Sequence, residues 1–366
     1  MLHIKRHPSN PILMPNPAAS WESFETFNGN VIKKDGVYHM VYRAVSDPQQ
    51  WQDEHLRVSS IGHAISTDGV NFTNREQCVI PEYEWERFSC EDPRVTWMDG
   101  WYYIFYTAIS TNPPSPRGIR IGVAMTRDFS TIEHKHLVTP FNAKAMALFP
   151  EKVNGKYAVI LTVDTDNPPA KIAVAMLDNL EQLWDAMFWE KWYSELPNHT
   201  LALQRRSRDH VEVGAVPVKT DKGWLFVYSY IQNYFSSNKL FGIEAALLDL
   251  NNPLQILGKT TGPFLVPQSY PEIYGTIPNI IFPSGVLLEG DTVRIYYGAS
   301  DTAVCLAEAS LDAMLKDIMT NALEYPLQCV HSALHLVRFD GNPILAPIRT
   351  DRCVAKGVFY AAVYSH

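Results

Sequence analysis

Four acidic residues lie in segments where carboxyl groups could take part in bond cleavage. They are Asp92, Glu212, Glu272 and Asp301, and each is close to a predicted strand and to small or turn-forming residues. Such neighbours leave room for a ligand to approach the backbone. Cleavage of a glycosidic bond needs paired carboxyl groups, because one acid protonates the leaving oxygen while a second group attacks or activates water. The four side chains could equally be turn carboxylates that cap backbone amides, and spacing alone leaves both interpretations open.

A strand pattern that returns five times would position these carboxylates. Each copy has an aromatic and β-branched strand, a loop, and a second strand rich in Ala and Gly. The pairs cover residues 37–44 and 61–68, 101–108 and 119–128, 156–162 and 171–178, 224–229 and 241–249, and 293–299 and 303–311. Alternation of apolar and polar positions is typical of half-buried antiparallel strands, and the spacing of the copies suits four-stranded blades. The pattern predicts an all-β fold, a five-bladed β-propeller with short helical insertions, as a single domain over residues 1–366.

Two other features refine this prediction. Residues 179–196 and 311–323 have apolar side chains at three- and four-residue steps, which predicts the helical insertions. The motif Asn-Pro-Ile-Leu-x-Pro at residues 10–15 returns at residues 342–347. The end of the chain thus begins the repeat again, which suggests that C-terminal strands close the ring against N-terminal ones and remove exposed sheet edges.

Composition excludes several classes of partner. The formal charge of −8 is modest and the basic residues are scattered, so neither nucleic acid nor an anionic membrane is expected as a partner. The first residues lack the apolar core of a signal peptide, and no stretch is apolar enough to span a bilayer, so we expect a cytoplasmic or periplasmic protein. The five cysteines are widely spaced without C-x-x-C, and the histidines show no ligand spacing, so no disulfide framework, metal or other cofactor is predicted.

Several segments together resemble glycoside hydrolase family 130, which comprises β-mannoside phosphorylases and related β-mannosidases on a five-bladed propeller. The resemblance covers most of the chain, in the family's order. The matching segments are residues 27–30 (FNGN), 41–44 (VYRA), 91–95 (EDPRV), 103–108 (YIFYTA), 148–152 (LFPEK), 154–157 (NGKY), 278–285 (PNIIFPSG) and 296–302 (YYGASDT).

The resemblance assigns roles by position. It implies that Asp92 is the catalytic acid in an inverting reaction, either directly or through a sugar hydroxyl. The residues that it implies for substrate binding are Asn28, Arg43, Arg94, Lys152 and Asp301. In the family's phosphorylases, the attacking species is inorganic phosphate held by a basic cluster of two arginines and a lysine.

This sequence departs from that basic cluster. Leu161 and Thr162 stand where the phosphorylases carry His-Arg, Glu212 stands where they carry Lys, and Ser229 stands where they carry His. A carboxylate in that place repels a phosphate dianion by roughly several tenths to a few kcal/mol, depending on the effective dielectric. The same carboxylate can activate water. We therefore hypothesise hydrolysis, with Asp92 as acid, Glu212 as general base and Glu272 sharing the orientation of water.

The leading hypothesis is an inverting, exo-acting β-mannosidase that acts on β-mannoside oligosaccharides, with β-1,2 the expected linkage and a homo-oligomer left open. One alternative is a mannoside phosphorylase that holds phosphate with an atypical basic loop at Arg205, Arg206 and Arg208, although a solvated loop explains that run as well. A five-bladed furanosidase is a more distant enzyme alternative. From another class, a non-catalytic sugar-binding propeller also fits the fold.

Overall fold

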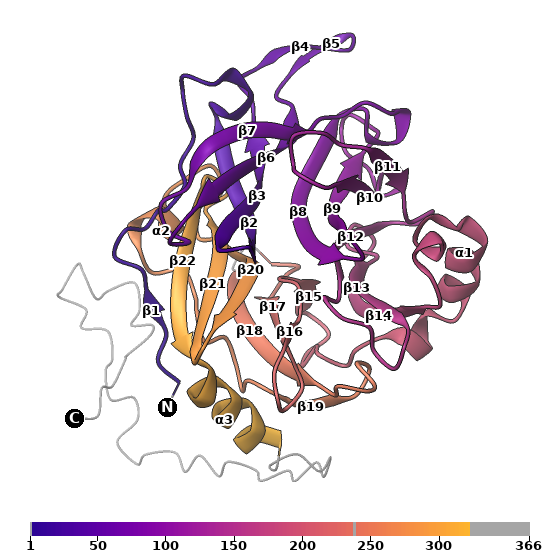
Figure 1. The fold of residues 1–366 in the computed structure, drawn as a ribbon, viewed down its shortest axis with the longest axis vertical. Coiled ribbons are helices and arrows are strands. Elements are labelled where there is room, and N and C mark those ends of the chain that lie inside the picture. Colours follow the sequence, from indigo (N-terminus) through magenta and orange to yellow (C-terminus); the bar gives the residue numbers. More distant parts are fainter. Residues whose placement is uncertain (1, 237–238, 323–366) are drawn as a thin grey trace, which may run out of the picture. The chain divides into compact units, whose positions relative to one another are not determined.

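Strands make up most of the regular structure in the computed structural model, which describes residues 2–236 and 239–322 (Figure 1). Five groups of antiparallel strands follow one another through these residues, and the first two are joined into one eight-stranded sheet by a single parallel pairing of Ser59 with Ser89. The first contains β2 (Glu25–Lys34), β3 (Val37–Val45), β6 (Ser59–Ser66) and β7 (Thr73–Val79). The second contains β8 (Ser89–Met98), β9 (Trp101–Ile109), β10 (Ile119–Thr126) and β11 (His134–Leu137). The third contains β12 (Ala143–Leu148), β13 (Tyr157–Val163) and β14 (Lys171–Leu177).

The remaining groups complete the series. The fourth contains β15 (His210–Val213), β16 (Val218–Lys219), β17 (Trp224–Gln232), β18 (Leu240–Leu248) and β19 (Ile256–Lys259). The fifth contains β20 (Ile281–Glu289), β21 (Thr292–Ala299) and β22 (Ala303–Ser310), with β1 (Lys5–Arg6) at its edge. A short hairpin of β4 (Gln49–Trp51) and β5 (Glu54–Leu56) projects from the first group. The five predicted strand pairs coincide with β3–β6, β9–β10, β13–β14, β17–β18 and β21–β22, so a mainly β fold is confirmed.

Neighbouring groups share apolar cores, and the fifth group packs against the first. Val41 and Ile104 belong to the core between the first and second groups, and Ile121 and Val159 to the core between the second and third. Further cores join the third group to the fourth, the fourth to the fifth, and the fifth to the first. At the centre, the first strands of the groups lie beside one another, with β2 against β8 and β20, and β12 against β8 and β15. Loops from all five groups can therefore reach one central place.

The helical segments only partly follow the prediction. The stretch 179–196 forms a 3-10 turn, Leu180–Trp184, and then α1 (Ala186–Ser194), rather than one helix. The break falls at Asp185, which has extended backbone dihedrals and caps α1 by accepting hydrogen bonds from the amides of Met187 and Phe188. The second predicted helix is confirmed as α3 (Leu311–Ala322), and a further turn, α2 (Tyr270–Ile273), precedes β20.

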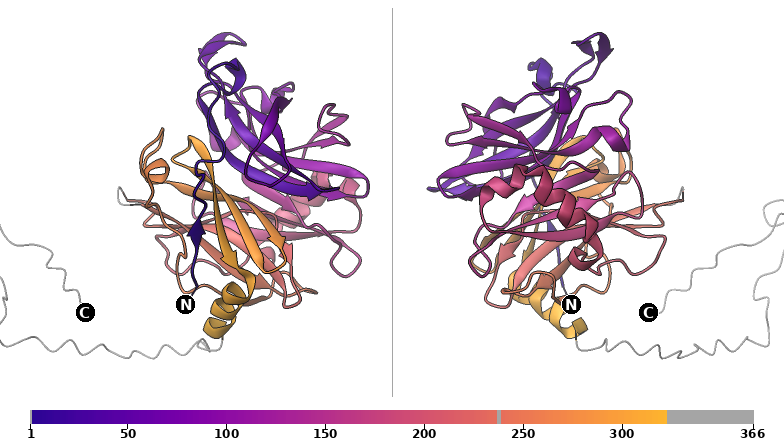
Figure 2. Two further views of the ribbon diagram at one scale, coloured as in Figure 1. Left: turned by 60° about the vertical axis from the view of Figure 1, so that its left-hand side comes forward. Right: turned by 90° about the vertical axis from the view of Figure 1, so that its right-hand side faces the viewer.

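The N-terminal segment completes the fifth group, as Figures 1 and 2 show for β1 beside β22. In β1, Lys5 pairs with Glu308 and Arg6 with Ala307. The Asn10 side chain then bonds in both directions with the backbone of Leu306, at 2.8 Å each. The first copy of the repeated Asn-Pro-Ile-Leu motif thus covers the edge of β22, which removes an exposed strand edge. The second copy, residues 342–347, lies outside the described residues, so its predicted pairing with N-terminal strands stays a prediction.

Candidate active site

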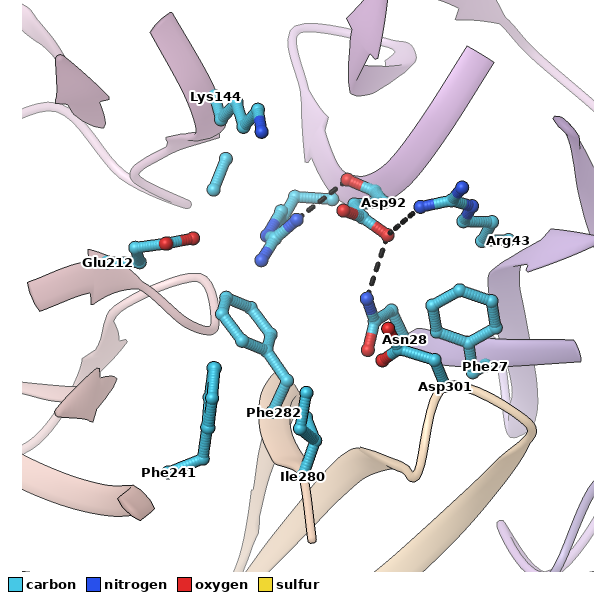
Figure 3. A pocket seen from close by; sticks show the side chains of 12 residues that line it. Phe27, Asn28, Arg43, Asp92, Lys144, Glu212, Phe241, Ile280, Phe282 and Asp301 are labelled. Carbon is cyan, nitrogen blue, oxygen red and sulfur yellow. Dashed lines mark hydrogen bonds and ion pairs between the residues drawn. The ribbon is translucent and has the colours of Figure 1, made fainter. Parts of the chain in front are cut away.

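A cavity of about 200 Å³ lies where the first strands of the groups meet (Figure 3). Residues from all five groups line it, so positions far apart in sequence converge in one place. The lining residues are Phe27, Asn28, Arg43, Asp92, Arg94, Lys144, Ala145, Glu212, Phe241, Ile280, Phe282 and Asp301. Six of the eight predicted site residues are among them: Asn28, Arg43, Asp92, Arg94, Glu212 and Asp301.

β-Bulges turn the central strands toward this cavity. The pairing registers of β2, β8 and β12 each shift once, at the positions of Asn28, Asp92 and Ala145. These three residues have positive φ values of 51°, 51° and 50°, and Asp301, in the turn after β21, has 48°. Left-handed backbone is uncommon for residues other than glycine, and it is concentrated at functional sites. A bulge re-aims the side chains next to it, which explains why polar groups face the cavity from strands that are otherwise apolar.

Two polar side chains, those of Asn28 and Arg43, approach the carboxylate of Asp92. Its Oδ1 accepts a hydrogen bond from Asn28 Nδ2 at 2.7 Å and lies 3.7 Å from a terminal nitrogen of Arg43. Arg43 also forms a 2.9 Å ion pair with Glu91 and donates to Ser59 at 3.1 Å. Burial raises the pKa of Glu91, while the positive charge of Arg43 lowers it, and the net shift is upward. The carboxyl group of Asp92 is thus held in one orientation while remaining part of the cavity wall.

Arg94 ties the strand of Asp92 to the strand of Glu212. Its guanidinium group donates to the backbone carbonyl groups of Asp92 at 2.7 Å, Gly214 at 2.9 Å and Val213 at 3.2 Å. The side chain is almost fully buried, and this burial lowers its pKa to about 10. Because three carbonyl groups accept hydrogen bonds from it, Arg94 holds β8 and β15 in place relative to each other, and it also lines the cavity.

Glu212 enters the cavity from β15, on a different side from Asp92 (Figure 3). It pairs across the sheet with Ser229 on β17, and its Oε1 lies 3.0 Å from His210 Nε2. Thr162 is fully buried, and its Oγ1 accepts a hydrogen bond from the amide of Val213 at 2.8 Å. Thr162 therefore supports the strand that carries Glu212.

Asp301 is the cavity residue with the largest change in acidity. Burial, together with the carboxylates of Asp92, Glu25 and Glu91, raises its pKa from 3.8 to about 7, against the opposing positive charge of Arg43. A carboxyl group with this pKa is partly protonated near neutral pH, so it can donate a hydrogen bond to a ligand as well as accept one.

Lys144 is a cavity residue that the sequence did not indicate. It lies beside the bulge of β12, and its Nζ forms a 3.1 Å ion pair with Asp166. Burial lowers the pKa of Lys144, but the charges of Asp166 and Glu212 raise it above its ordinary value. A single lysine within the otherwise apolar run of residues 143–148 was the available signal. The apolar wall formed by Phe241, Ile280 and Phe282 was also not predicted.

Two predicted site residues lie elsewhere. Lys152 is in the turn between β12 and β13, exposed to solvent, with its ammonium group 4.2 Å from the ring centre of Tyr157. Neither Lys152 nor Glu272 lines the cavity. Glu272 was predicted from its position in a loop near a strand and Lys152 from the family resemblance, but the fold places both away from the cavity.

Glu272 has the alternative role of a capping carboxylate. It lies in α2, is fully buried, and forms a 2.7 Å ion pair with Arg6. It also accepts hydrogen bonds from the hydroxyl group of Tyr297 at 2.7 Å and from the amides of Gln268 and Ser269 at 2.7 and 3.0 Å. Burial would raise the pKa of Glu272, but these donors lower it overall. Because its oxygen atoms are occupied, Glu272 cannot share in the orientation of water.

Two of the three arginines in the basic loop form ion pairs within the protein. Arg205 forms a 2.6 Å ion pair with the buried Glu244, and Arg206 pairs with Asp209 at 3.0 Å. None of the three arginines at 205, 206 and 208 lines the cavity. Among the described residues, no three His, Cys, Asp or Glu side chains are grouped so as to hold a metal ion, and no helix there is long and apolar enough to cross a membrane.

The geometry defines a class of protein: a mainly β enzyme-like scaffold with a central cavity rich in carboxylates. Comparison with known proteins gives the family. The family model for glycoside hydrolase family 130, described as β-1,4-mannooligosaccharide phosphorylase, matches residues 3–320. A 1,2-β-oligomannan phosphorylase from Thermoanaerobacter sp. (strain X514) is 31% identical over 309 residues, which cover 84% of this chain and 97% of that protein.

Solved structures agree on the fold. The β-1,2-mannobiose phosphorylase of Listeria innocua, in complex with β-1,2-mannobiose, has a TM-score of 0.71 at 24% identity and covers 87% of this chain and 99% of its own. A second solved structure comes from the GH130 family of mannoside phosphorylases, which contains glycoside hydrolases that target β-1,2-mannosidic linkages in Candida mannan. It has a TM-score of 0.63 at 20% identity, and the match covers 84% of this chain and 93% of that chain. The chain belongs to glycoside hydrolase family 130, a family of enzymes that act on glycosides.

Proposed function

We propose that this protein is an inverting, exo-acting hydrolase that releases mannose from β-mannosides, with β-1,2 linkages as the expected substrate. The observation that carries the proposal is the placement of Glu212 in the same cavity as Asp92, on a different side. This arrangement offers an acid for the leaving oxygen and a base for an attacking water molecule, which are the two groups that inversion by water needs.

The cations of the cavity support water rather than phosphate as the attacking species. Arg43 is paired with Glu91 and approaches Asp92, Lys144 is paired with Asp166, and Arg94 donates to three carbonyl groups. A phosphate dianion would have to displace these partners and would also meet the negative charge of Glu212. Phosphate sites in proteins usually offer uncommitted arginine or backbone donors instead.

The reaction that follows is balanced in protons. Glu212 accepts a proton from water as the water oxygen bonds to the anomeric carbon. The bond between that carbon and the glycosidic oxygen breaks, and the leaving oxygen receives a proton from Asp92, directly or through a sugar hydroxyl group. Mannose and the shortened glycoside leave, and exchange with solvent returns Asp92 and Glu212 to their starting states. A cavity of about 200 Å³ suits one terminal sugar unit better than the middle of a chain, which supports exo action.

The fold supports the same proposal. The five strand groups, with shared cores that include one between the fifth and the first, are what a five-bladed propeller requires, and we take this as the architecture. The substrate class is inferred from relatives, since proteins about 30% identical to this chain are named for β-1,2-mannobiose and β-1,2-oligomannan. The side chains available for a mannosyl unit are Asn28, Arg43, Arg94 and Asp301.

Phosphorolysis is the second candidate function. Relatives from Thermoanaerobacter and Listeria innocua are named phosphorylases, and three cationic side chains do line the cavity. If substrate binding released Lys144 from Asp166, this ammonium group could meet a phosphate oxygen. The product would then be mannose 1-phosphate instead of mannose.

One experiment separates the two candidates. β-1,2-Mannobiose and β-1,4-mannobiose are incubated with the protein, with and without inorganic phosphate, and mannose and mannose 1-phosphate are measured. Hydrolysis predicts mannose from the β-1,2 substrate at a rate that phosphate does not raise, and NMR should show the α-anomer of the new mannose first. Accumulation of mannose 1-phosphate with phosphate-dependent cleavage would establish phosphorolysis instead. No cleavage of either sugar would favour a sugar-binding protein without this activity.

A further inference from the structure

We propose that His210 is a positioning residue that holds the carboxylate of Glu212 in the orientation needed to activate water. This inference rests on the proposed function, because it assigns a partner to the proposed base. It was not indicated by the sequence, where His210 is one of twelve histidines without ligand spacing. The structure singles it out through its contacts, its burial and an unpartnered ring nitrogen.

The strand places the two side chains together. His210 and Glu212 are two residues apart on β15, so they project from the same face of the sheet, while Val211 and Val213 face the apolar core. His210 Nε2 lies 3.0 Å from Glu212 Oε1. The histidine side chain is only 1% exposed, whereas that of Glu212 is 16% exposed and reaches the cavity. The contact therefore anchors the carboxylate from its buried side.

The other ring nitrogen, Nδ1, determines which protonation state and tautomer of His210 the site accommodates. Within the described residues, His210 Nδ1 is buried and has no hydrogen-bond partner. A protonated imidazolium would place an unsatisfied N–H donor there, which is costly in a buried site. A neutral ring with its proton on Nε2 leaves only an unshared electron pair at Nδ1 and donates its single N–H to Glu212. His210 thus acts as a hydrogen-bond donor of fixed direction.

Packing keeps the ring from turning. The His210 ring stacks on Tyr234, with ring centres 4.0 Å apart and planes 12° from parallel. Tyr234 is itself held by a 2.9 Å hydrogen bond from its amide to the carbonyl group of Arg208, and the preceding amide, of Asn233, bonds to Asp209 at 3.1 Å. The loop that carries Arg205, Arg206 and Arg208 therefore supports the histidine, which gives that basic run a structural purpose.

The consequence is that one oxygen of Glu212 is committed and the other is available. With Oε1 bound to His210, the carboxylate loses rotational freedom, and Oε2 remains as the acceptor for a water proton. Misplacing a catalytic group by about 1 Å can cost on the order of 100-fold in rate. Removing the donor should accordingly slow the chemical step while leaving the sugar-binding residues in place.

The test compares variants of the full chain in the phosphate-free hydrolysis assay. His210→Phe keeps a flat ring against Tyr234 but removes the donor, and we expect kcat to fall by about 10- to 100-fold with KM within about twofold. His210→Gln can place an amide donor near the position of Nε2, so we expect it to recover most of the loss. His210→Asn is too short to reach Glu212, so we expect it to behave like His210→Phe.

A matched control tests whether loss of any stacked histidine has the same effect. His39 is half-buried, stacks on Phe129 with ring centres 4.9 Å apart, and does not line the cavity. His39→Phe should leave kcat and KM unchanged within about twofold. If His210→Phe does not fold, the kcat values of His210→Gln and His210→Asn alone decide whether His210 positions Glu212.

The outcomes separate this inference from the function on which it rests. If the wild-type protein hydrolyses the substrate and His210→Phe keeps its kcat, or Gln and Asn are equally impaired, the positioning role is wrong and the proposed hydrolase stands. If the wild-type protein releases no mannose without phosphate, the hydrolase proposal fails, and the role of His210 in activating water fails with it.

Discussion

Glu212 and Glu272 show how two glutamates with similar sequence surroundings come to lie in different environments. Both precede small or turn-forming residues, and their sequence surroundings gave both a place in catalysis. In the structure, Glu272 is fully buried and accepts hydrogen bonds from Arg6, Tyr297 and two backbone amides. Glu212 keeps 16% of its side chain exposed at the cavity and contacts one donor, His210.

The difference lies in how many acceptor positions each carboxylate has left. A carboxylate has about four lone-pair sites, and the donors around Glu272 use them to stabilise the charge and hold a turn. Glu212 has sites left for a water molecule. A catalytic carboxylate is therefore recognised by what remains unbound as much as by where it lies, and the predictions below test this distinction.

The largest effect should follow from removing the charge at Glu212. We expect Glu212→Gln to lower kcat for hydrolysis by roughly 10²- to 10⁴-fold, because an amide cannot accept the proton of the attacking water. The free energy of unfolding should change by no more than about 0.5 kcal/mol, since the side chain is at the edge of a cavity. Steady-state kinetics and urea unfolding measure the two effects. A variant with normal kcat would remove Glu212 from the mechanism.

The opposite pattern is expected for Glu272→Gln. This change leaves Arg6 without its partner in a partly buried site, and we expect unfolding to become easier by roughly 2 to 4 kcal/mol. The kcat of the folded fraction should stay within about twofold of the wild-type value.

A control for Glu272 is available on the surface. Glu151 pairs with Lys219, and both side chains are about half exposed. Glu151→Gln should change the free energy of unfolding by less than about 0.5 kcal/mol, because exposed ion pairs contribute little. Equal urea midpoints for the Glu272 and Glu151 variants would show that burial does not separate these two glutamates.

The fold could be predicted in its outline because strand alternation is a local property. The five strand pairs follow the apolar and polar periods of residues 37–68 through 293–311, and the structure has strands at all of them. The predicted helix over residues 179–196 was too long, because the preference of Asp185 for a capping position competes with the apolar period of the segment. What remained hidden was the set of bulges in β2, β8 and β12, which depends on pairing between strands rather than on composition.

The site was predictable only where its residues were marked by turn-forming neighbours or a family motif. Asp92 has both marks, in the sequence Glu-Asp-Pro-Arg, and lies in the cavity. Lys144 has neither and was not found. The role of Glu272 was mistaken because its partner Arg6 is 266 positions away in sequence, and such long-range pairing cannot be deduced from local spacing.

A smaller effect on kcat/KM is expected from a substitution that crowds Asn28, the neighbour of Asp92, and leaves every carboxylate unchanged. A Cβ atom at Gly298 would lie 2.1 Å from Asn28 Oδ1, so Gly298→Ala must displace the amide that donates to Asp92. We expect kcat/KM to fall about tenfold, the equivalent of one hydrogen bond of about 1.4 kcal/mol. Gly262→Ala is the control, because nothing lies within 4 Å of its added Cβ atom. Equal kinetics for both variants would mean that Asn28 does not orient Asp92.

The smallest effect should appear in the pH dependence of stability, where Asp301 and Glu272 act in opposite directions. Burial raises the pKa of Asp301 from 3.8 to about 7, so the folded state retains its proton over a range in which the unfolded state has lost it. The contribution of Asp301 to stability is therefore full below about pH 4 and is lost as the pH rises toward 7. For Glu272, hydrogen bonds lower the pKa, so its contribution is present above the unfolded pKa and is lost as the pH falls.

Asp301→Asn isolates the first of these effects, because an amide of similar shape cannot ionise. Between about pH 4 and pH 7, the Tm of the wild-type protein should fall relative to that of the variant, and thermal unfolding at several pH values measures the difference. Below about pH 4, both proteins should lose stability together, since both retain Glu272. Parallel Tm curves across the whole range would show that Asp301 ionises normally and that its burial in the cavity does not raise its pKa.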